Sequence, residues 1–228
     1  YGVGDLCSIT EAVWVSPDGD DNNLGTSVSE AFLTIERALE MIAPEPNNII
    51  TINLTGGSEA EPDIFAPSTT GEIFPIYIIS HINIIGQGKE ATIIDAEQIY
   101  GVIYIHNCKN NIISGLSLTG GGTAIDLYFS DLIIEDVSIN NNGMVYNPNT
   151  SGSSGGGLSS FNSSANLYNV DLINNYSQDY YGGIAINNYG ILAQPTIHEL
   201  YNVNISNNIC GEGACGIWVE GEELSLIM

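Results

Sequence analysis

The sequence predicts an all-β fold, a parallel β-helix whose coils stack as a solenoid behind a short N-terminal capping helix. Three observations support this prediction. A strand motif recurs at fixed spacing, apolar residues alternate within each copy, and one segment of the 228 residues has a helical pattern. Because strands recur with no helix between them, we expect them to stack in parallel, one coil upon the next.

The repeat is clearest in the second half of the chain. Its aligned copies are "LIIEDVSINNNG" at 132–143, "ANLYNVDLINNYS" at 165–177 and "HELYNVNISNNIC" at 198–210. Equivalent residues such as Val137 and Val170 lie 33 positions apart, and an earlier copy places Leu116 21 positions before Val137. Spacings of this size, with inserts of variable length, are typical of one solenoid coil per repeat.

Two features of the repeat indicate corners and a second strand. Asparagines coincide from coil to coil at Asn141, Asn174 and Asn207. Asparagine tolerates the left-handed backbone of a tight corner, and stacked amides can hydrogen-bond as a ladder. Two glycines followed by alternating apolar residues recur at 155–163 and 182–190, with a related phrase at 215–223. We interpret this phrase as a second strand of each coil.

The N-terminal part is less regular. Strands are predicted within 48–57, 75–88, 91–96 and 101–107, with the polar segment 58–72 as an excursion loop. The helix is predicted within 30–43, where Phe32, Ile35, Leu39 and Ile42 share one face and Pro44 ends it. Such a helix would cover the open end of the apolar column.

We expect one domain over 1–228. Its parts are an N-terminal strand, acidic turn and cap helix at 1–47, irregular first coils at 48–110, and regular repeats at 111–228. The sequence stops within an expected strand, "GEELSLIM". The solenoid is therefore expected either to continue in a longer protein or to be covered there by another subunit.

The charge balance excludes several partners. The 27 acidic residues face three basic ones, Arg37, Lys89 and Lys109, which gives a net charge of −24. Such a surface repels nucleic acid and anionic lipid, and no apolar run of about 18 residues could span a bilayer. Only 13% of residues are charged. The remaining polarity comes from Asn, Ser, Thr and Gly, which favours an extracellular or cell-surface protein.

Cysteines and sequons fit export. Cys210 and Cys215 could close a short disulfide loop, whereas Cys7 and Cys108 are either paired or buried thiols. Candidate glycosylation sites in Asn-x-Ser/Thr triplets are Asn53, Asn149, Asn162, Asn175 and Asn204.

A calcium site is the candidate cofactor site. The stretch "DGDDNN" offers Asp18, Asp20, Asp21 and Asn22 as oxygen ligands. It lacks the glycine and the final glutamate of an EF-hand, since Ser29 stands at the twelfth position. The alternative is a turn rich in residues that favour turns.

Residues 13–42, "VWVSPDGDDNNLGTSVSEAFLTIERALEMI", resemble the opening of secreted right-handed parallel β-helix proteins of the pectate-lyase-like superfamily. The later repeats resemble those of bacterial surface β-helix proteins, including polymorphic outer-membrane and adhesin-like types. The resemblance implies a right-handed coil and export. It does not imply one function, because this fold hosts lyases, hydrolases, phage tailspikes and inert surface modules.

Catalysis has weak support in the residues. Lyases of that superfamily commonly use Arg or Lys as base with acidic calcium ligands, and Lys109 is the best candidate here. A hydrolase that inverts needs two carboxylates about 6.5–9.5 Å apart, which a cluster of Asp126, Glu135 and Asp136 could supply. A solvated outer face explains these residues more simply, so no catalytic residue is assigned.

The favoured function is therefore a non-catalytic extracellular surface or matrix protein, either adhesin-like or self-assembling. Its expected partners are other copies or surface proteins joined end to end, and neutral glycans stacked on tyrosines such as Tyr168 and Tyr201. Ladder stabilisation explains these tyrosines equally well. The alternative is a polysaccharide lyase or glycoside hydrolase. Ice binding is disfavoured because Thr119 and Thr123 have no partners one repeat on.

Overall fold

The computed structural model describes residues 9–99, 101–143, 156–190 and 195–228 of the chain. Strands of this part form a twelve-stranded, a six-stranded and a two-stranded sheet. Each pair of neighbouring strands in these sheets is parallel. The predicted all-β parallel β-helix is therefore confirmed.

The twelve-stranded sheet consists of two rows. The first row is β1 (Val13–Val15), β2 (Ile50–Leu54), β5 (Ile82–Ile85), β8 (Asn111–Thr119), β10 (Asp131–Asn140), β12 (Ser164–Tyr168), β16 (Thr196–Tyr201) and β20 (Leu224–Ile227). The second row is β3 (Asp63–Phe65), β6 (Thr92–Asp95), the distal halves of β8 and β10, β13 (Asp171–Ile173) and β17 (Asn204–Ser206). The long strands β8 and β10 thus turn a corner and belong to both rows.

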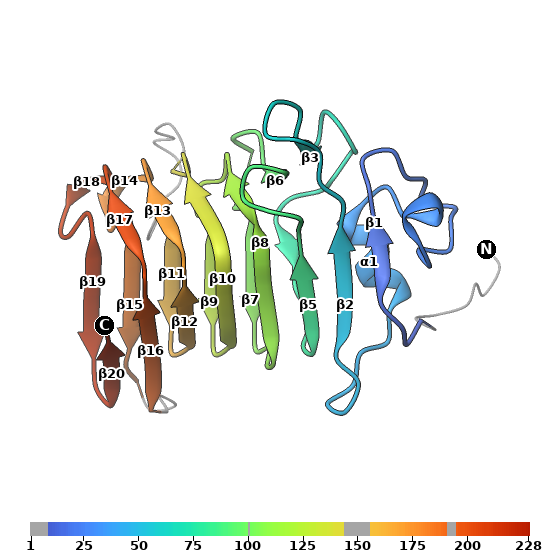
Figure 1. The fold of residues 1–228 in the computed structure, drawn as a ribbon. Helices are drawn as coiled ribbons and strands as arrows, with labels where there is room; N and C mark the ends of the chain where they lie inside the picture. Colours follow the sequence, from blue (N-terminus) through green and yellow to red (C-terminus); the bar gives the residue numbers. More distant parts are fainter. Residues whose placement is uncertain (1–8, 100, 144–155, 191–194) are drawn as a thin grey trace.

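The other sheets complete each coil. The six-stranded sheet is β4 (Ile76–Tyr77), β7 (Ile103–His106), β9 (Ile125–Tyr128), β11 (Leu158–Phe161), β15 (Ile184–Asn188) and β19 (Ile217–Gly221). A third pair is β14 (Tyr176–Tyr180) with β18 (Ile209–Glu212). In Figure 1 the first row runs upward in front, β19 runs downward, and the chain advances from right to left, which is a right-handed coil.

The register follows the sequence repeat. Val137 pairs with Leu116, 21 positions earlier, and Leu172 lies between Ile139 and Ile205 at spacings of 33. The recurring glycine phrase does form a second strand, because β11, β15 and β19 pair side by side. One spacing in the sequence therefore corresponds to one coil of the helix.

The core is a column of aliphatic side chains inside the coils. One line of it contains, at successive strands of the first row, Ile52, Ile84, Ile113, Ile134, Leu167 and Leu200, of which none is more than 9% exposed. Strands in a sheet lie about 4.8 Å apart. Each side chain therefore packs directly against its equivalent in the next coil, and apolar burial stabilises the stack along its whole length.

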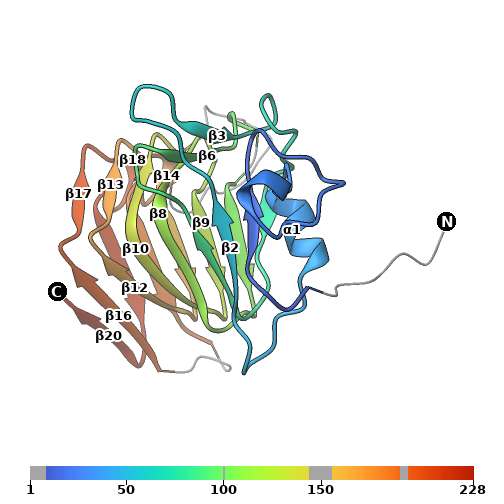
Figure 2. The same ribbon diagram turned by 45° about the vertical axis from the view of Figure 1, so that its right-hand side comes forward.

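A short helix covers the N-terminal end of this column (Figure 2). Helix α1 (Ile35–Met41) buries Ile35 and Ala38 against the core, and a 3₁₀ turn, η1 (Val28–Glu30), precedes it. The helix is shorter than the predicted segment because Phe32 is extended and bridges to Val15. It ends before Pro44, since a residue preceding proline disfavours helical geometry.

The predicted excursion loop is only partly a loop. Within 58–72 the chain forms β3, which pairs with β6. Beyond β3, Glu72 is 2% exposed, and its carboxylate accepts the backbone N–H groups of Ile35 at 2.8 Å and Glu36 at 3.0 Å. Burial raises the pKa of Glu72 to about 7. The excursion therefore anchors the cap helix with a desolvated carboxyl group.

Candidate functional site

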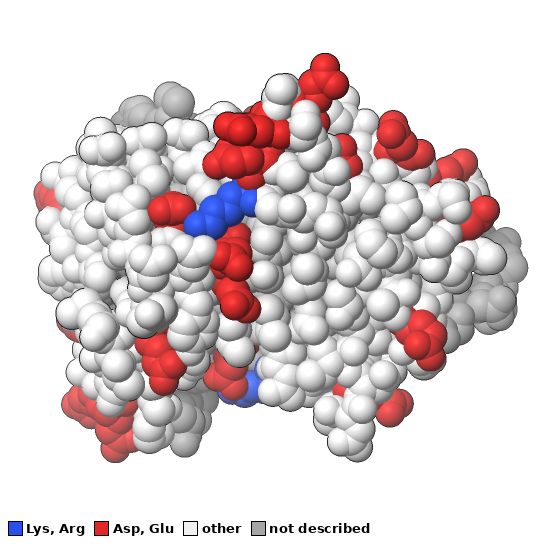
Figure 3. All heavy atoms as spheres, in the orientation of Figure 1, with Lys and Arg blue, Asp and Glu red and all other residues white. Residues whose placement is uncertain are grey.

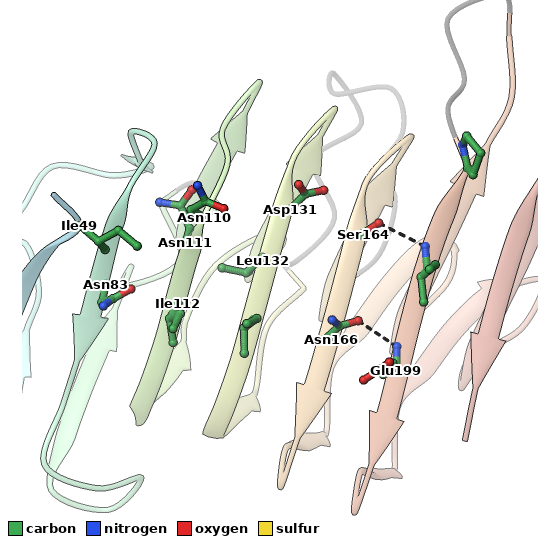
Figure 4. A pocket seen from close by; sticks show the side chains of 13 residues that line it. Ile49, Asn83, Asn110, Asn111, Ile112, Asp131, Leu132, Ser164, Asn166 and Glu199 are labelled. Atoms are coloured by element: carbon green, nitrogen blue, oxygen red, sulfur yellow. Dashed lines mark hydrogen bonds between the residues drawn. The ribbon is translucent and has the colours of Figure 1, made fainter. Parts of the chain in front are cut away.

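A groove of about 580 Å³ crosses the outer surface of the first row (Figure 4). It extends from the segment before β2 to β16, across five neighbouring strands. Its lining is Ile49, Asn83, Asn110, Asn111, Ile112, Asp131, Leu132, Ile133, Ser164, Asn166, Pro195, Ile197 and Glu199. Amide, hydroxyl and aliphatic groups predominate in this set.

Strand register positions the groove. Asn83, Ile112, Ile133 and Asn166 are partners on β5, β8, β10 and β12, so they form one line across the coils. Ile133 is 36% exposed, and Ile197 at the far side is 50% exposed. The floor is therefore an apolar centre with an amide on either side. Such a surface suits an uncharged ligand that has both apolar faces and hydroxyl groups.

The acidic groups of the groove already have partners. The Asp131 carboxylate lies 2.9 Å from the Lys109 ammonium. The Glu199 carboxylate accepts a 2.5 Å hydrogen bond from the Tyr168 hydroxyl, which raises the pKa of Tyr168. Figure 3 shows that acidic side chains form a broken line across the middle of this face and that most of its surface is uncharged.

The three basic residues all form ion pairs. Lys109 pairs with Asp131, as described, and Lys89 lies 2.8 Å from Asp171. Arg37 lies 3.2 Å from Glu40 on the cap helix. Lys109 would have to leave Asp131 before its side chain could contact a substrate.

The acidic cluster proposed for hydrolysis is not brought together. Asp126 lies on β9 of the six-stranded sheet, 3.4 Å from the His106 ring. Glu135 and Asp136 lie on β10 of the other sheet, and both are exposed because Asp136 has a φ of 52° at the corner of the coil. In a regular strand these two neighbours would point to opposite faces of the sheet. The left-handed backbone at Asp136 turns both side chains to the outside of the coil.

The acidic turn is engaged in local hydrogen bonds. One Asp21 oxygen accepts the N–H groups of Leu33 at 2.8 Å and Thr34 at 3.0 Å. Asp20 accepts two hydrogen bonds from Asn22, which lower the pKa of Asp20. Within the described ranges no group of three or more His, Cys, Asp or Glu residues could hold a metal. Calcium binding by this turn stays a prediction.

The structure separates the sequons by exposure. The Asn175 side chain is fully buried and donates to the Ile139 carbonyl, so the folded chain cannot carry a glycan there. Asn162 is 8% exposed and donates to Tyr189. Asn149 lies outside the described residues. Asn53 and Asn204 are more accessible, and their modification stays a prediction.

The cysteines differ in state. Cys210 and Cys215 form a disulfide that closes the loop after β18. Cys108 is a buried free thiol whose pKa is raised by burial, and Cys7 lies outside the described residues. None of the helices in the described part of the chain is long and apolar enough to cross a membrane.

Sequence reasoning missed the groove itself. Its apolar centre, Ile112 and Ile133, lies at outward positions of strands that were interpreted as core strands. The only available signal was that β10 has apolar residues at three successive positions, Leu132 to Ile134. Strand alternation requires that one of these three points outward.

No family model and no curated protein sequence matches the chain. Among solved structures, pectate lyase Pel9A aligns with 96% of this chain and 80% of its own, at 11% identity and a TM-score of 0.37. A rhamnogalacturonan lyase aligns with 96% of this chain and 62% of its own, at 11% identity and a TM-score of 0.42.

Proposed function

We propose that the chain is a non-catalytic, adhesin-like module of an extracellular surface or matrix. One observation supports this above all: each acidic side chain lining the groove is already held by a partner in the fold, Asp131 by Lys109 and Glu199 by Tyr168. General acid–base catalysis needs a group that is free to exchange a proton with substrate. The carboxylates of this groove already have partners within the fold, and its amides are neutral. Such a groove is suited to binding a ligand without reacting with it.

A polysaccharide lyase or glycoside hydrolase is the second candidate. The position of Lys109 beside the groove supports it, because Lys109 contacts Asp131, which lines the groove. This alternative needs substrate to displace the ion pair, whereas the binding function needs no rearrangement.

Incubation with neutral and acidic polysaccharides, with and without calcium, distinguishes the two. New reducing ends report hydrolysis, and the absorbance of unsaturated products reports β-elimination. We expect neither. Turnover that is abolished by Lys109→Ala or Asp136→Asn, and retained in the control Arg37→Ala on the cap helix, would establish the enzyme instead.

A further inference from the structure

Six rings form a continuous row on the outer surface of the six-stranded sheet. Neighbouring ring centroids lie between 5.1 and 5.7 Å apart. In order along the row they are Tyr77, Tyr104, His106, Tyr128, Phe161 and Tyr189. We call these six residues the aromatic row. It lies on a different sheet from the groove.

The row is accessible and follows the coil spacing. Tyr77, Tyr128 and Tyr189 are 63%, 43% and 49% exposed. Tyr77 and Tyr104 are register partners, as are His106, Tyr128 and Phe161, and the row passes from the first line to the second within β7. Within each line the rings advance with the strand spacing of about 4.8 Å. That step is close to the length of one sugar unit in an extended polysaccharide. A polymer lying across the strands could meet a new ring at each coil.

The central rings hold one another in place. Tyr104 and His106 are stacked with an interplanar angle of 13°, and Tyr128 and Phe161 with one of 10°. At the ends, Tyr77 and Tyr189 are turned by 88° and 86° from their neighbours. Packed rings lose little freedom when a ligand is bound, which lowers the entropic cost of binding.

Charge selects among partners. Carboxylates lie near the row: Asp126 is 3.4 Å from the His106 ring, and Glu36 and Glu40 line a pocket together with Tyr77. Docking of a second copy, or of an acidic polymer, would set negative charge against a chain of −24. An uncharged polymer avoids this repulsion. Tyrosine combines an apolar ring with a hydroxyl, and sugars likewise combine apolar ring faces with hydroxyl groups.

We propose that the aromatic row binds an extended, uncharged polysaccharide, with about one sugar unit for each coil. The inference rests on the proposed function in one respect, that the polymer is held and not cleaved. It adds the surface and the chemical class of the ligand. The narrow row fits a linear polymer better than the broad patch of a protein interface.

Affinity electrophoresis tests the proposal. The whole chain is run through native gels containing soluble β-glucan, xyloglucan or galactomannan, with polygalacturonate as the acidic comparison. We expect retardation by at least one neutral polymer and none by polygalacturonate. The double variant Tyr77→Ala, Tyr128→Ala should bind at least about tenfold more weakly, because two ring contacts are lost.

Two control variants make the result decisive. Leu24→Ala removes an apolar side chain that is 66% exposed in the N-terminal part of the chain and should leave binding unchanged. Tyr128→Phe keeps the ring and should retain most affinity, so a fold defect in the alanine variant is recognised. Absence of retardation by all three neutral polymers, or equal binding by the double variant, would overturn the proposal. Cleavage of a polymer that still binds would instead refute only the non-catalytic function.

Discussion

In each coil, two adjacent asparagines have different structural roles, one at the corner and one in a hydrogen-bonded ladder. Asn141, Asn174 and Asn207 adopt φ values of 53°, 57° and 56° and turn the corner. The following residues, Asn142, Asn175 and Asn208, point inward and form the ladder. Asn175 accepts from the Asn142 backbone at 3.1 Å and donates to the Asn208 side chain at 3.1 Å. Backbone groups at the corner thus find partners that strand pairing does not provide.

Replacement of Asn175 by alanine should destabilise the protein by about 2–4 kcal/mol, because the buried Asn142 N–H and the Ile139 carbonyl lose their partners. Urea denaturation measures the change in unfolding free energy. Asn174→Gly is the matched control, since glycine adopts the same left-handed backbone without cost in the folded state. Equal losses in the two variants would show that the ladder adds no stability of its own.

The ladder also shows where sequence reasoning stops. The 33-residue spacing predicts that asparagines stack, and the left-handed corner at Asn174 agrees with that prediction. The pattern does not reveal which of two adjacent asparagines points inward, because both recur at the same spacing. Only the backbone angle at Asn174, which directs Asn175 into the coil, decides between them.

At the scale of elements, the cap helix depends on side chains from outside it. Seven residues are too few for an isolated helix to be stable. Thr34 caps α1 by accepting the Arg37 N–H at 3.0 Å, and Glu72 accepts the first two N–H groups of the helix, those of Ile35 and Glu36. Asp21 holds the segment just before the helix. The acidic turn and the excursion loop therefore position the helix over the core.

Asp21→Ala should lower unfolding free energy by about 2 kcal/mol in calcium-free buffer, because the Leu33 and Thr34 N–H groups lose their acceptor. Asp20→Ala, in an exposed position of the same turn, should change it little. Thermal denaturation with EDTA and then with added calcium checks both variants. A calcium-dependent rise in Tm that Asp20→Ala abolishes would show that the turn is a metal site.

The helix was predictable in kind and position, and its length was not. Apolar spacing from Phe32 to Ile42 indicated a helical face. However, Phe32 pairs with β1 as an extended residue and still points into the core. A pattern of buried positions cannot distinguish these two conformations at a helix end, since both bury the same side chain.

At the scale of the whole molecule, two buried titratable groups lie at opposite ends of the solenoid. Glu72 supports the cap, and His198 lies on β16, near the C-terminal end. Burial lowers the pKa of His198 to about 4, and its Nδ1 accepts the Ala165 N–H at 3.3 Å. Their pKa values are shifted in opposite directions, so their contributions to the free energy of unfolding oppose one another as the pH changes.

The sign follows from the proton balance. Between about pH 4.5 and 7 the folded state keeps a proton on Glu72 that the unfolded state has lost, so stability falls as pH rises. For His198 the unfolded state holds the extra proton between about pH 4 and 6.5, so stability falls as pH drops. Each effect amounts to about 3 kcal/mol.

Single variants should therefore separate two effects that largely cancel in the parent chain. Glu72→Gln should leave a protein that loses stability on acidification from pH 7 to 4.5, because the His198 contribution is unopposed. His198→Asn keeps a hydrogen-bond acceptor without a titrating ring and should gain stability over the same range. Urea denaturation of both variants and the parent at several pH values measures this, and the other carboxylates act equally in all three. If the unfolding free energies of the three proteins changed in parallel with pH, neither Glu72 nor His198 would be desolvated as its burial indicates.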